Sequence, residues 1–415
     1  MNESLWVIIK TTLPMEISMT ISQSLYDPCE DSLDAAIELL TSIEPTDVGI
    51  TSCYIDIESG IDASLEEITA EAKSIGSDLD ETARYELDDA LSRIKVAVCE
   101  EQEPEVRGLA IFSRSMIGGR FWQVIPTSLP FRNQLTYYRV PDVRPLLSLR
   151  DVCNEQFVVW STSGGVELLR FGGGSSRTLA WMAESQMQRP EVEALESPVL
   201  KPIIGAGHRR FHTLARNTLS RVLRPVRGLH LVLAGDPARL EQLGKWLPGS
   251  MLSSVRQRIP VSPYLSRHKA LRQIADHAAS GVRDAVDAFA NACLRFPHLS
   301  RSCVSGANKT LSALCSRSLE LLFISGEKRF LSSRKSSSGK SKRAGLSTRS
   351  GRLSGNTGIW HAEIELSRLA CQLQVPVLVT HATQRVLKDG VGGIHRNQYP
   401  KAVETCHPRL AYGCR

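Results

Sequence analysis

The sequence contains none of the short motifs that mark the common zinc, nucleotide and acyl-transfer sites. None of its ten cysteines forms a C-x-x-C pair, which argues against a zinc ribbon, and their scattered positions argue against a disulfide framework. No H-E-x-x-H, G-x-S-x-G or complete Walker-type phosphate loop is present. We therefore expect reduced thiols, no metal site and no cofactor.

Long apolar runs are absent as well. The apolar run at residues 5–9 is too short to span a membrane or to form the core of a signal peptide, and no basic residue precedes it. These features predict a soluble protein of the cytoplasm that has no membrane partner.

Basic side chains are scarce in the first 100 residues. This part carries 22 acidic and 5 basic side chains, a net charge of −17, whereas residues 101–415 carry 22 acidic and 45 basic side chains, a net charge of +23. The asymmetry predicts an acidic N-terminal module, available to a protein partner, joined to a part of the chain that faces nucleic acid. The alternative is that the two oppositely charged parts pair with each other.

The pattern of apolar residues predicts mixed α and β structure in the first part of the chain. Residues 50–57 alternate like a strand, and Ser64 is placed to cap an acidic helix, which a second helix over 80–96 follows. Residues 141–149, with two prolines, predict a connector into the next domain. Further strands are predicted at 108–112 and 121–125.

The later segments predict α/β structure. A hairpin over residues 157–171 precedes a nearly all-apolar run at 229–234, which is typical of a buried parallel strand, and residues 235–237 then supply a cap and a first-turn proline for a helix. After a long helix over 268–294, residues 308–380 repeat this rhythm of strand and helix. We predict a multi-domain α/β protein with an α+β domain at 1–150 and α/β domains at 151–297 and 298–415.

The feature that points most directly to function is a glycine-containing segment that leads into a basic amphipathic helix. Gly205 and Gly207 form a flexible tip before His208. On a helical wheel, one side carries Phe211, Leu214, Ala215, Thr218, Leu219, Val222 and Leu223. The other side carries the candidate RNA-binding residues Arg209, Arg210, Arg216, Arg221, Arg224 and Arg227. Such a segment suits insertion into folded RNA, and the alternative is an ordinary solvated helix face.

A second basic segment lies in the last third of the chain. Residues 328–352 hold nine basic side chains and no acidic one, within a Ser- and Gly-rich insertion predicted at 328–358. We expect this insertion to be disordered when free and to be drawn to phosphate groups, and the alternative is a bare solubilising loop. The candidate phosphate contacts are Arg334, Lys335, Lys340, Lys342 and Arg343.

In this order, the segments resemble the archaeal and eukaryotic class-1 peptide-chain release factor family, relatives of the Pelota ribosome-rescue proteins, and in particular its bacterial members. The resemblance implies an RNase H-like middle domain and a C-terminal domain like the ribosomal proteins that bind kink-turns. It is carried by the strand at 50–57, the connector at 141–151, the hairpin at 157–171, the strand and helix at 229–240 and the glycine-rich strand at 389–396.

The resemblance also implies a function at the ribosome, with rRNA and peptidyl-tRNA as partners. In the family, a Gly-Gly-Gln loop before a basic helix enters the peptidyl-transferase centre and positions water against the peptidyl-tRNA ester. This chain has Gly205, Gly207 and His208 at that place, and it has no glutamine there. His208 is a candidate to position water, and the alternative is that it contacts phosphate or stacks on a base.

Two functions therefore follow from the resemblance. One is a release- or rescue-type translation factor that promotes peptidyl-tRNA hydrolysis. The other is a non-catalytic RNA-binding adaptor that has lost the active loop. A protein–protein module whose acidic and basic halves engage different partners is the third alternative.

Overall fold

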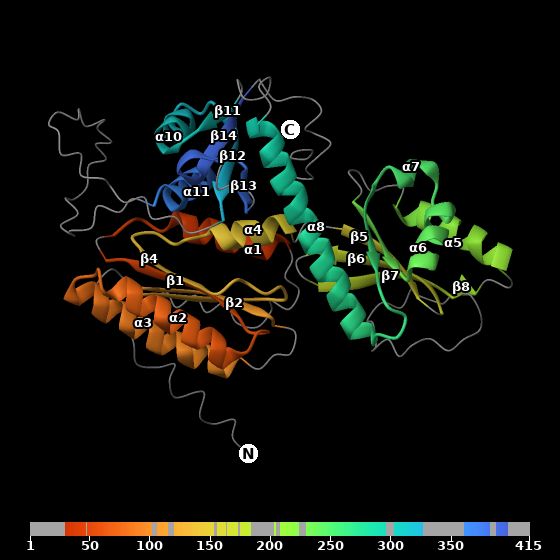
Figure 1. The fold of residues 1–415 in the computed structure, drawn as a ribbon, viewed down its shortest axis with the longest axis horizontal. Coiled ribbons are helices and arrows are strands. Elements are labelled where there is room, and N and C mark those ends of the chain that lie inside the picture. Colours follow the sequence, from red (N-terminus) through yellow and green to blue (C-terminus); the bar gives the residue numbers. More distant parts are fainter. Residues whose placement is uncertain are drawn as a thin grey trace, which may run out of the picture.

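A computed structural model describes thirteen segments of the chain, and within them the chain forms three β-sheets flanked by helices (Figure 1). The mixed α/β architecture is as predicted, and the sheets are built in turn from residues 50–138, 156–260 and 303–395. The domain boundaries near 150 and 297 remain predictions. The described residues are 30–46, 48–101, 106–114, 120–152, 156–162, 164–172, 175–183, 203–204, 208–223, 230–295, 303–326, 361–381 and 387–396.

The first sheet is antiparallel, with the strand order β3-β2-β1-β4. Because side chains of a strand alternate between the faces, Cys53 and Ile55 pack under two helices, whereas Tyr54 and Phe112 face the opposite side. The two covering helices are α2 (Ile61–Gly76) and α3 (Glu81–Glu100). The strands are β1 (Ile50–Asp56), β2 (Gly108–Arg114), β3 (Phe121–Thr127) and β4 (Gln134–Tyr138).

The predicted helix cap at Ser64 is wrong. Helix α2 begins at Ile61, and the residue at its N-cap position, Gly60, makes no side-chain cap. Ser64 is buried inside the helix, where its hydroxyl donates a hydrogen bond to the carbonyl oxygen of Asp56 at 2.6 Å. A serine can bond to the backbone from positions other than a cap, so the motif was ambiguous.

The second sheet combines antiparallel and parallel strands in the order β10-β9-β5-β6-β7-β8. The predicted hairpin is β5–β6, and the predicted buried parallel strand is β9, which lies between β5 and β10. Helices α5 (His208–Leu223) and α6 (Pro237–Trp246) cover one face, and the first half of α8 (Arg267–Arg295) covers the other. The remaining elements are β5 (Gln156–Thr162), β6 (Gly165–Gly172), β7 (Ser175–Ala183), β8 (Ile203–Ile204), β9 (Leu231–Gly235), β10 (Val255–Pro260) and α7 (Gly249–Leu252).

The turn from β9 into α6 has the predicted cap. The carboxylate of Asp236 accepts hydrogen bonds from the amides of Ala238 and Arg239 at 3.0 and 3.2 Å, and Pro237 occupies the first turn. Gly235 has a φ of 150°, and a β-carbon at this position would lie 2.9 Å from the carbonyl oxygen of Ser161. The glycine therefore allows β9 to approach β5 closely where the chain turns.

The third sheet has the order β11-β14-β12-β13. Strands β12 and β13 are parallel, whereas β14 is antiparallel to both β11 and β12. The strands are β11 (Cys303–Ser305), β12 (Leu319–Ser325), β13 (Val377–Thr380) and β14 (Val391–His395). The helical elements are α10 (Ala307–Cys315), α11 (Ala362–Gln372) and the short 3-10 helix η2 (Lys388–Gly390).

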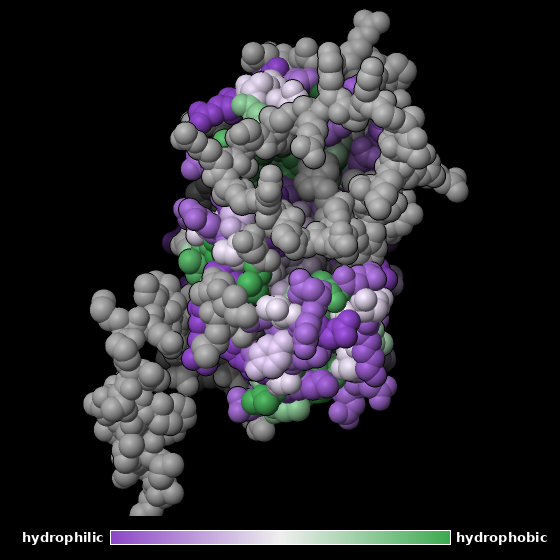
Figure 2. Space-filling model, turned by 90° about the vertical axis from the view of Figure 1, so that its left-hand side faces the viewer, coloured by the Kyte–Doolittle hydropathy of each residue, from purple (hydrophilic) through white to green (hydrophobic). Residues whose placement is uncertain are grey.

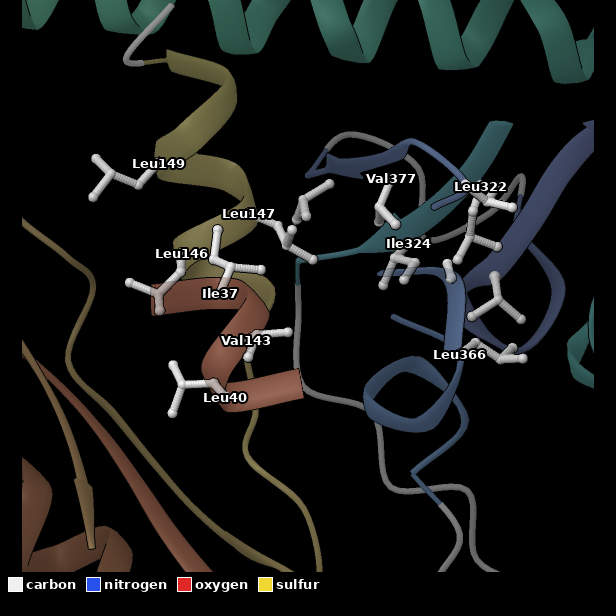
Figure 3. Close-up of a cluster of buried hydrophobic side chains, with 14 of the residues drawn as sticks. Ile37, Leu40, Val143, Leu146, Leu147, Leu149, Leu322, Ile324, Leu366 and Val377 are labelled. Atoms are coloured by element: carbon white, nitrogen blue, oxygen red, sulfur yellow. The ribbon is translucent and has the colours of Figure 1, made fainter. Parts of the chain in front are cut away.

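The segment predicted as a connector forms a buried helix, α4 (Arg144–Val152). Leu146 and Leu147 of this helix share one apolar core with Leu40 of α1 (Glu30–Ser42) and with Leu322 and Ile324 of the third sheet (Figure 3). The prolines of the segment stand before the helix and in its first turn, where proline is tolerated, so they do not prevent it from forming. The first and third sheets are thereby joined across a common core.

Helix α8 connects the second and third sheets as one continuous helix (Figure 1). Its first half packs on the second sheet and its second half packs on the third. It also pairs with the first sheet region, where Arg272 contacts Glu58 at 2.5 Å and Asp276 contacts Arg107 at 2.7 Å. In one pair α8 supplies the basic residue, Arg272, and in the other it supplies the acidic residue, Asp276. These contacts are therefore not a pairing of one acidic domain with one basic domain.

No helix among the described residues combines the length and the apolar character that a membrane span requires.

Candidate nucleic-acid interface

Helix α5 has the amphipathic arrangement that its sequence predicts. It begins at His208 and ends at Leu223. Ala215, Leu219 and Leu223 are buried in a core that they share with Leu243 of α6 and with strands of the second sheet. The side chains of residues 208–212 and 214 lie outside the described part, so the wheel is tested only from Thr213 onward.

The opposite side of α5 faces solvent. Arg216, Asn217 and Arg221 are exposed. Among the described side chains, no carboxylate lies within ion-pair distance of either arginine, and the helix itself contains no acidic residue. Two guanidinium groups are therefore presented outward from a helix whose other face is anchored.

The acidic part of the chain lies away from α5. In Figure 1, α5 stands at the right-hand end of the molecule, whereas α2 and α3 cover the first sheet at the left. The exposed acidic residues of those two helices are Asp62, Glu66, Glu67, Glu81, Asp88 and Glu100. In the lower half of Figure 2, the residues drawn in colour at this end of the molecule are mostly hydrophilic, with scattered hydrophobic ones. The described arginines of α5 are thus not covered by the acidic module.

Most of the predicted site residues lie outside the part of the chain that the structure describes. Arg209 and Arg210 belong to the first turn of α5, as does His208, and only their backbone is described. The residues that lie outside the described part are Gly205, Gly207, Arg224, Arg227, Arg334, Lys335, Lys340, Lys342 and Arg343. The structure therefore describes the surface position of Arg216 and Arg221 alone among the predicted RNA contacts.

The direction of the strands determines where α5 begins. Strands β5, β7, β8, β9 and β10 all run the same way, because β6 is antiparallel to β5 and to β7, and the other neighbours are parallel. Their carboxyl ends therefore share one edge of the sheet, and α5, α6 and α8 all begin at that edge. This is the edge at which α/β sheets commonly bind ligands.

A buried carboxylate holds the start of α8 against this sheet. Glu167 of β6 is almost fully buried, and one of its oxygens accepts hydrogen bonds from Thr178 at 2.5 Å and from Arg267 at 2.7 Å. The Arg267 guanidinium also lies 5.7 Å from the ring centre of Trp160. The sequence gives no signal for this cluster of side chains, since Arg267 is 100 positions away from Glu167 and 89 positions away from Thr178.

Sequence reasoning also missed a third basic stretch. Residues 246–275 contain five basic side chains, one histidine and no acidic residue. The structure exposes Arg256 and Arg258 on β10, and His268 and Lys269 at the start of α8. The absence of acidic residues over 30 positions is visible in the sequence and could have identified this stretch.

No family model matches the chain, and no curated protein matches it. Among solved structures, the chain is similar to the crystal structure of an archaeal translation termination factor, with 15% identity over 89% of this chain and 98% of that chain and a TM-score of 0.24. It is also similar to Pelota from Archaeoglobus fulgidus, with 12% identity over 69% of this chain and 79% of that chain and a TM-score of 0.36. A model of ribosome-bound archaeal Pelota and ABCE1 gives 10% identity over 88% and 94%, with a TM-score of 0.33.

Proposed function

We propose that this chain is a translation factor of the release and rescue type, which binds the ribosome through rRNA and tRNA. The observation that carries the proposal is the outward face of α5, where Arg216 and Arg221 are exposed and the described surroundings hold no carboxylate partner. Contacts between cationic side chains and phosphate groups supply most of the affinity of a protein for nucleic acid. A rigid helix whose guanidinium groups have no carboxylate partner among the described residues is suited to this task.

The domain identities and the remaining site residues belong to the same proposal. The second sheet, with two antiparallel pairs followed by parallel strands joined through helices, supports an RNase H-like middle domain. The kink-turn-binding identity of the C-terminal domain is proposed from the sequence resemblance alone. Gly205, Gly207 and His208 are proposed as the tip that approaches the peptidyl-tRNA ester, and the 328–358 insertion is proposed to add contacts to phosphate groups.

A specific observation favours the second candidate, a non-catalytic RNA-binding adaptor. The chain has Ala206 and His208 in the segment where release factors have a Gly-Gly-Gln loop, so the glutamine that belongs to water positioning is absent. The adaptor would keep the RNA contact of α5 without accelerating hydrolysis. An acidic surface on α2 and α3 is proposed, in either case, for a protein partner.

Two measurements on the full-length protein test these functions. Co-sedimentation with purified ribosomes should weaken steeply as monovalent salt rises from about 50 to about 200 mM, because counterion release makes phosphate binding salt-dependent. Binding that does not respond to salt, or no binding at all, would overturn the translation-factor proposal. A peptide-release assay on stalled ribosomes then separates the two functions.

The release assay compares the wild type with Gly207→Pro, which restricts the proposed tip without changing its charge. Release by the wild type that the substitution abolishes supports catalysis. Binding without release by the wild type assigns the adaptor function.

A further inference from the structure

The loop between β10 and α8, residues 261–266, presents a tyrosine to solvent. Tyr264 is 95% exposed, more than any other large hydrophobic residue in the described part of the chain, and Leu265 beside it is 36% exposed. A ring this exposed buries almost no apolar surface in the fold. It is therefore available to a partner.

The loop is held firmly at both ends. At its start, the amide of Val261 donates to the carbonyl oxygen of Gly235 at 2.9 Å, and the Val261 side chain is buried. At its end, Arg267 binds the buried carboxylate of Glu167. Within it, the amide of Leu265 donates to the carbonyl oxygen of Ser262 at 3.3 Å. The loop is thus an anchored support for Tyr264, and little further ordering is needed when the ring makes a contact.

Basic side chains surround the tyrosine in sequence, and acidic ones are absent. His268 and Lys269 are exposed in the first turn of α8, directly after the loop. Arg256 and Arg258 are exposed along the edge strand that leads into it. No acidic residue occurs between positions 246 and 275, so the local charge favours an anionic partner.

We propose that this Tyr264 loop is a second RNA-binding surface, in which the ring stacks on an unpaired base and His268 and Lys269 contact the adjacent phosphates. Aromatic rings interleaved with cations are how proteins hold single-stranded nucleic acid without reading its sequence. A protein partner would call for a broader apolar patch around the ring, and Leu265 is the one other exposed large hydrophobic residue in this described loop. The inference rests on the proposed function, since it assigns a further contact to the same RNA-binding protein.

The topology places this loop where a second contact is useful. The loop follows the carboxyl end of β10, at the edge of the sheet where α5 also begins. Strands β10 and β7, beneath the two surfaces, are separated by four strand spacings, which amounts to roughly 19 Å. Helix α5 and the start of α8 lie on opposite faces of this sheet, so an RNA that contacts both surfaces passes around the edge at which the two helices begin.

The test is fluorescence anisotropy with a fluorescein-labelled, single-stranded RNA of mixed sequence and the full-length protein. Tyr264→Ala should weaken binding about fivefold or more, because stacking on an aromatic ring is lost, and Tyr264→Phe should retain the wild-type affinity. The matched control is Tyr85→Ala on α3, which removes another exposed tyrosine, 69% exposed, from the acidic end of the molecule. It should bind as the wild type does.

The dependence on salt distinguishes stacking from a change in charge. Tyr264→Ala should leave the slope of log Kd against log salt unchanged, whereas Lys269→Gln should lower it. Circular dichroism confirms that the variants are folded, which is expected for exposed positions.

If Tyr264→Ala binds the RNA with wild-type affinity, the inference is overturned. The proposed function would still stand in that case if Arg216→Gln/Arg221→Gln reduced RNA binding. Loss of ribosome binding by Tyr264→Ala without loss of RNA binding would assign the loop to a ribosomal protein and would also overturn it. If the wild type binds neither RNA nor ribosomes, both proposals fall together.

Discussion

At the scale of single residues, Gly235 shows how a backbone requirement fixes an amino acid. Its positive φ and the 2.9 Å approach of a hypothetical β-carbon to Ser161 both exclude a side chain. We predict that Gly235→Ala lowers the free energy of unfolding by about 1–3 kcal/mol, the cost of a residue held in a disfavoured conformation. Urea unfolding measures the change.

The matched control for Gly235→Ala is Gly249→Ala in α7. A β-carbon at Gly249 would meet nothing within 4 Å, so this substitution should leave the unfolding midpoint close to that of the wild type. Equal midpoints for the two variants would contradict the role given to Gly235.

His230 is expected to make stability depend on pH. Burial lowers the pKa of its imidazole below the ordinary value of 6.5, and the nearby Arg256 lowers it further. The unfolded chain therefore takes up a proton at higher pH than the folded chain, so the free energy of unfolding falls as pH falls below about 6.5 and levels off below the pKa of the folded state. His230→Gln should show a smaller fall in Tm between about pH 7 and about pH 5 than the wild type.

The control for this prediction is His268→Gln, which removes an exposed imidazole. If the fall in Tm over this pH range is the same for His230→Gln and the wild type, the titration of His230 does not contribute to stability.

Residue-level features were predictable from the sequence only where the cause is local. Asp236 and Pro237 were identified correctly because a cap depends on neighbours within three positions. Ser64 was misassigned because its hydroxyl bonds to Asp56, outside the helix it seemed to start. The pairing of Glu167 with Arg267 could not be predicted, because it depends on how α8 lies across the sheet.

At the scale of elements, a buried ion pair between Asp142 and Arg144 at the start of α4 bridges two sheets. Tyr54 of the first sheet donates its hydroxyl to the carbonyl oxygen of Asp142 at 2.6 Å, and Arg144 donates to the carbonyl oxygen of Ser325 in the third sheet at 3.5 Å. The carboxylate of Asp142 accepts two hydrogen bonds from the guanidinium of Arg144, at 2.8 and 2.7 Å, and both side chains are buried. Burial lowers the pKa of Arg144, but the Asp142 carboxylate outweighs this effect, so its pKa is raised from the ordinary value. The pair therefore remains charged in the interior.

Removing one charged partner of this ion pair should lower the free energy of unfolding more than replacing both partners. We predict that Asp142→Asn costs about 3 kcal/mol or more of unfolding free energy, because it leaves the Arg144 charge buried without its main partner. Asp142→Asn/Arg144→Met should recover part of that loss, because no buried charge is left uncompensated. A double-mutant cycle in urea measures the coupling, and additive losses would contradict this account.

Elements were predicted well where their periodicity is strong. The strands β1, β2, β5 and β9 and the long helix α8 lie where the apolar pattern placed them. The sequence predicts a connector where α4 lies, because the prolines of this segment obscure the apolar residues that it buries. Its packing against α1 and the third sheet depends on residues far away in the chain.

At the scale of the whole molecule, charge is separated along the structure. The acidic helices α2 and α3 and the basic helix α5 occupy opposite ends, with α8 between them (Figure 1). The charge asymmetry was evident in the sequence, but the distance between the two surfaces was not. This separation leaves the described cations of α5 available to an anionic partner.

The central claim is that the outward face of α5 binds RNA phosphates. The most direct test is the affinity for ribosomes, measured across a salt series, of Arg216→Gln/Arg221→Gln and of the control Lys73→Gln/Lys95→Gln, which removes two exposed lysines from α2 and α3. The α5 variant should bind more weakly, and its slope of log Kd against log salt should be smaller by about 0.7–0.9 for each lost phosphate contact. The control should match the wild type. An α5 variant whose affinity and slope equal those of the control would contradict the claim.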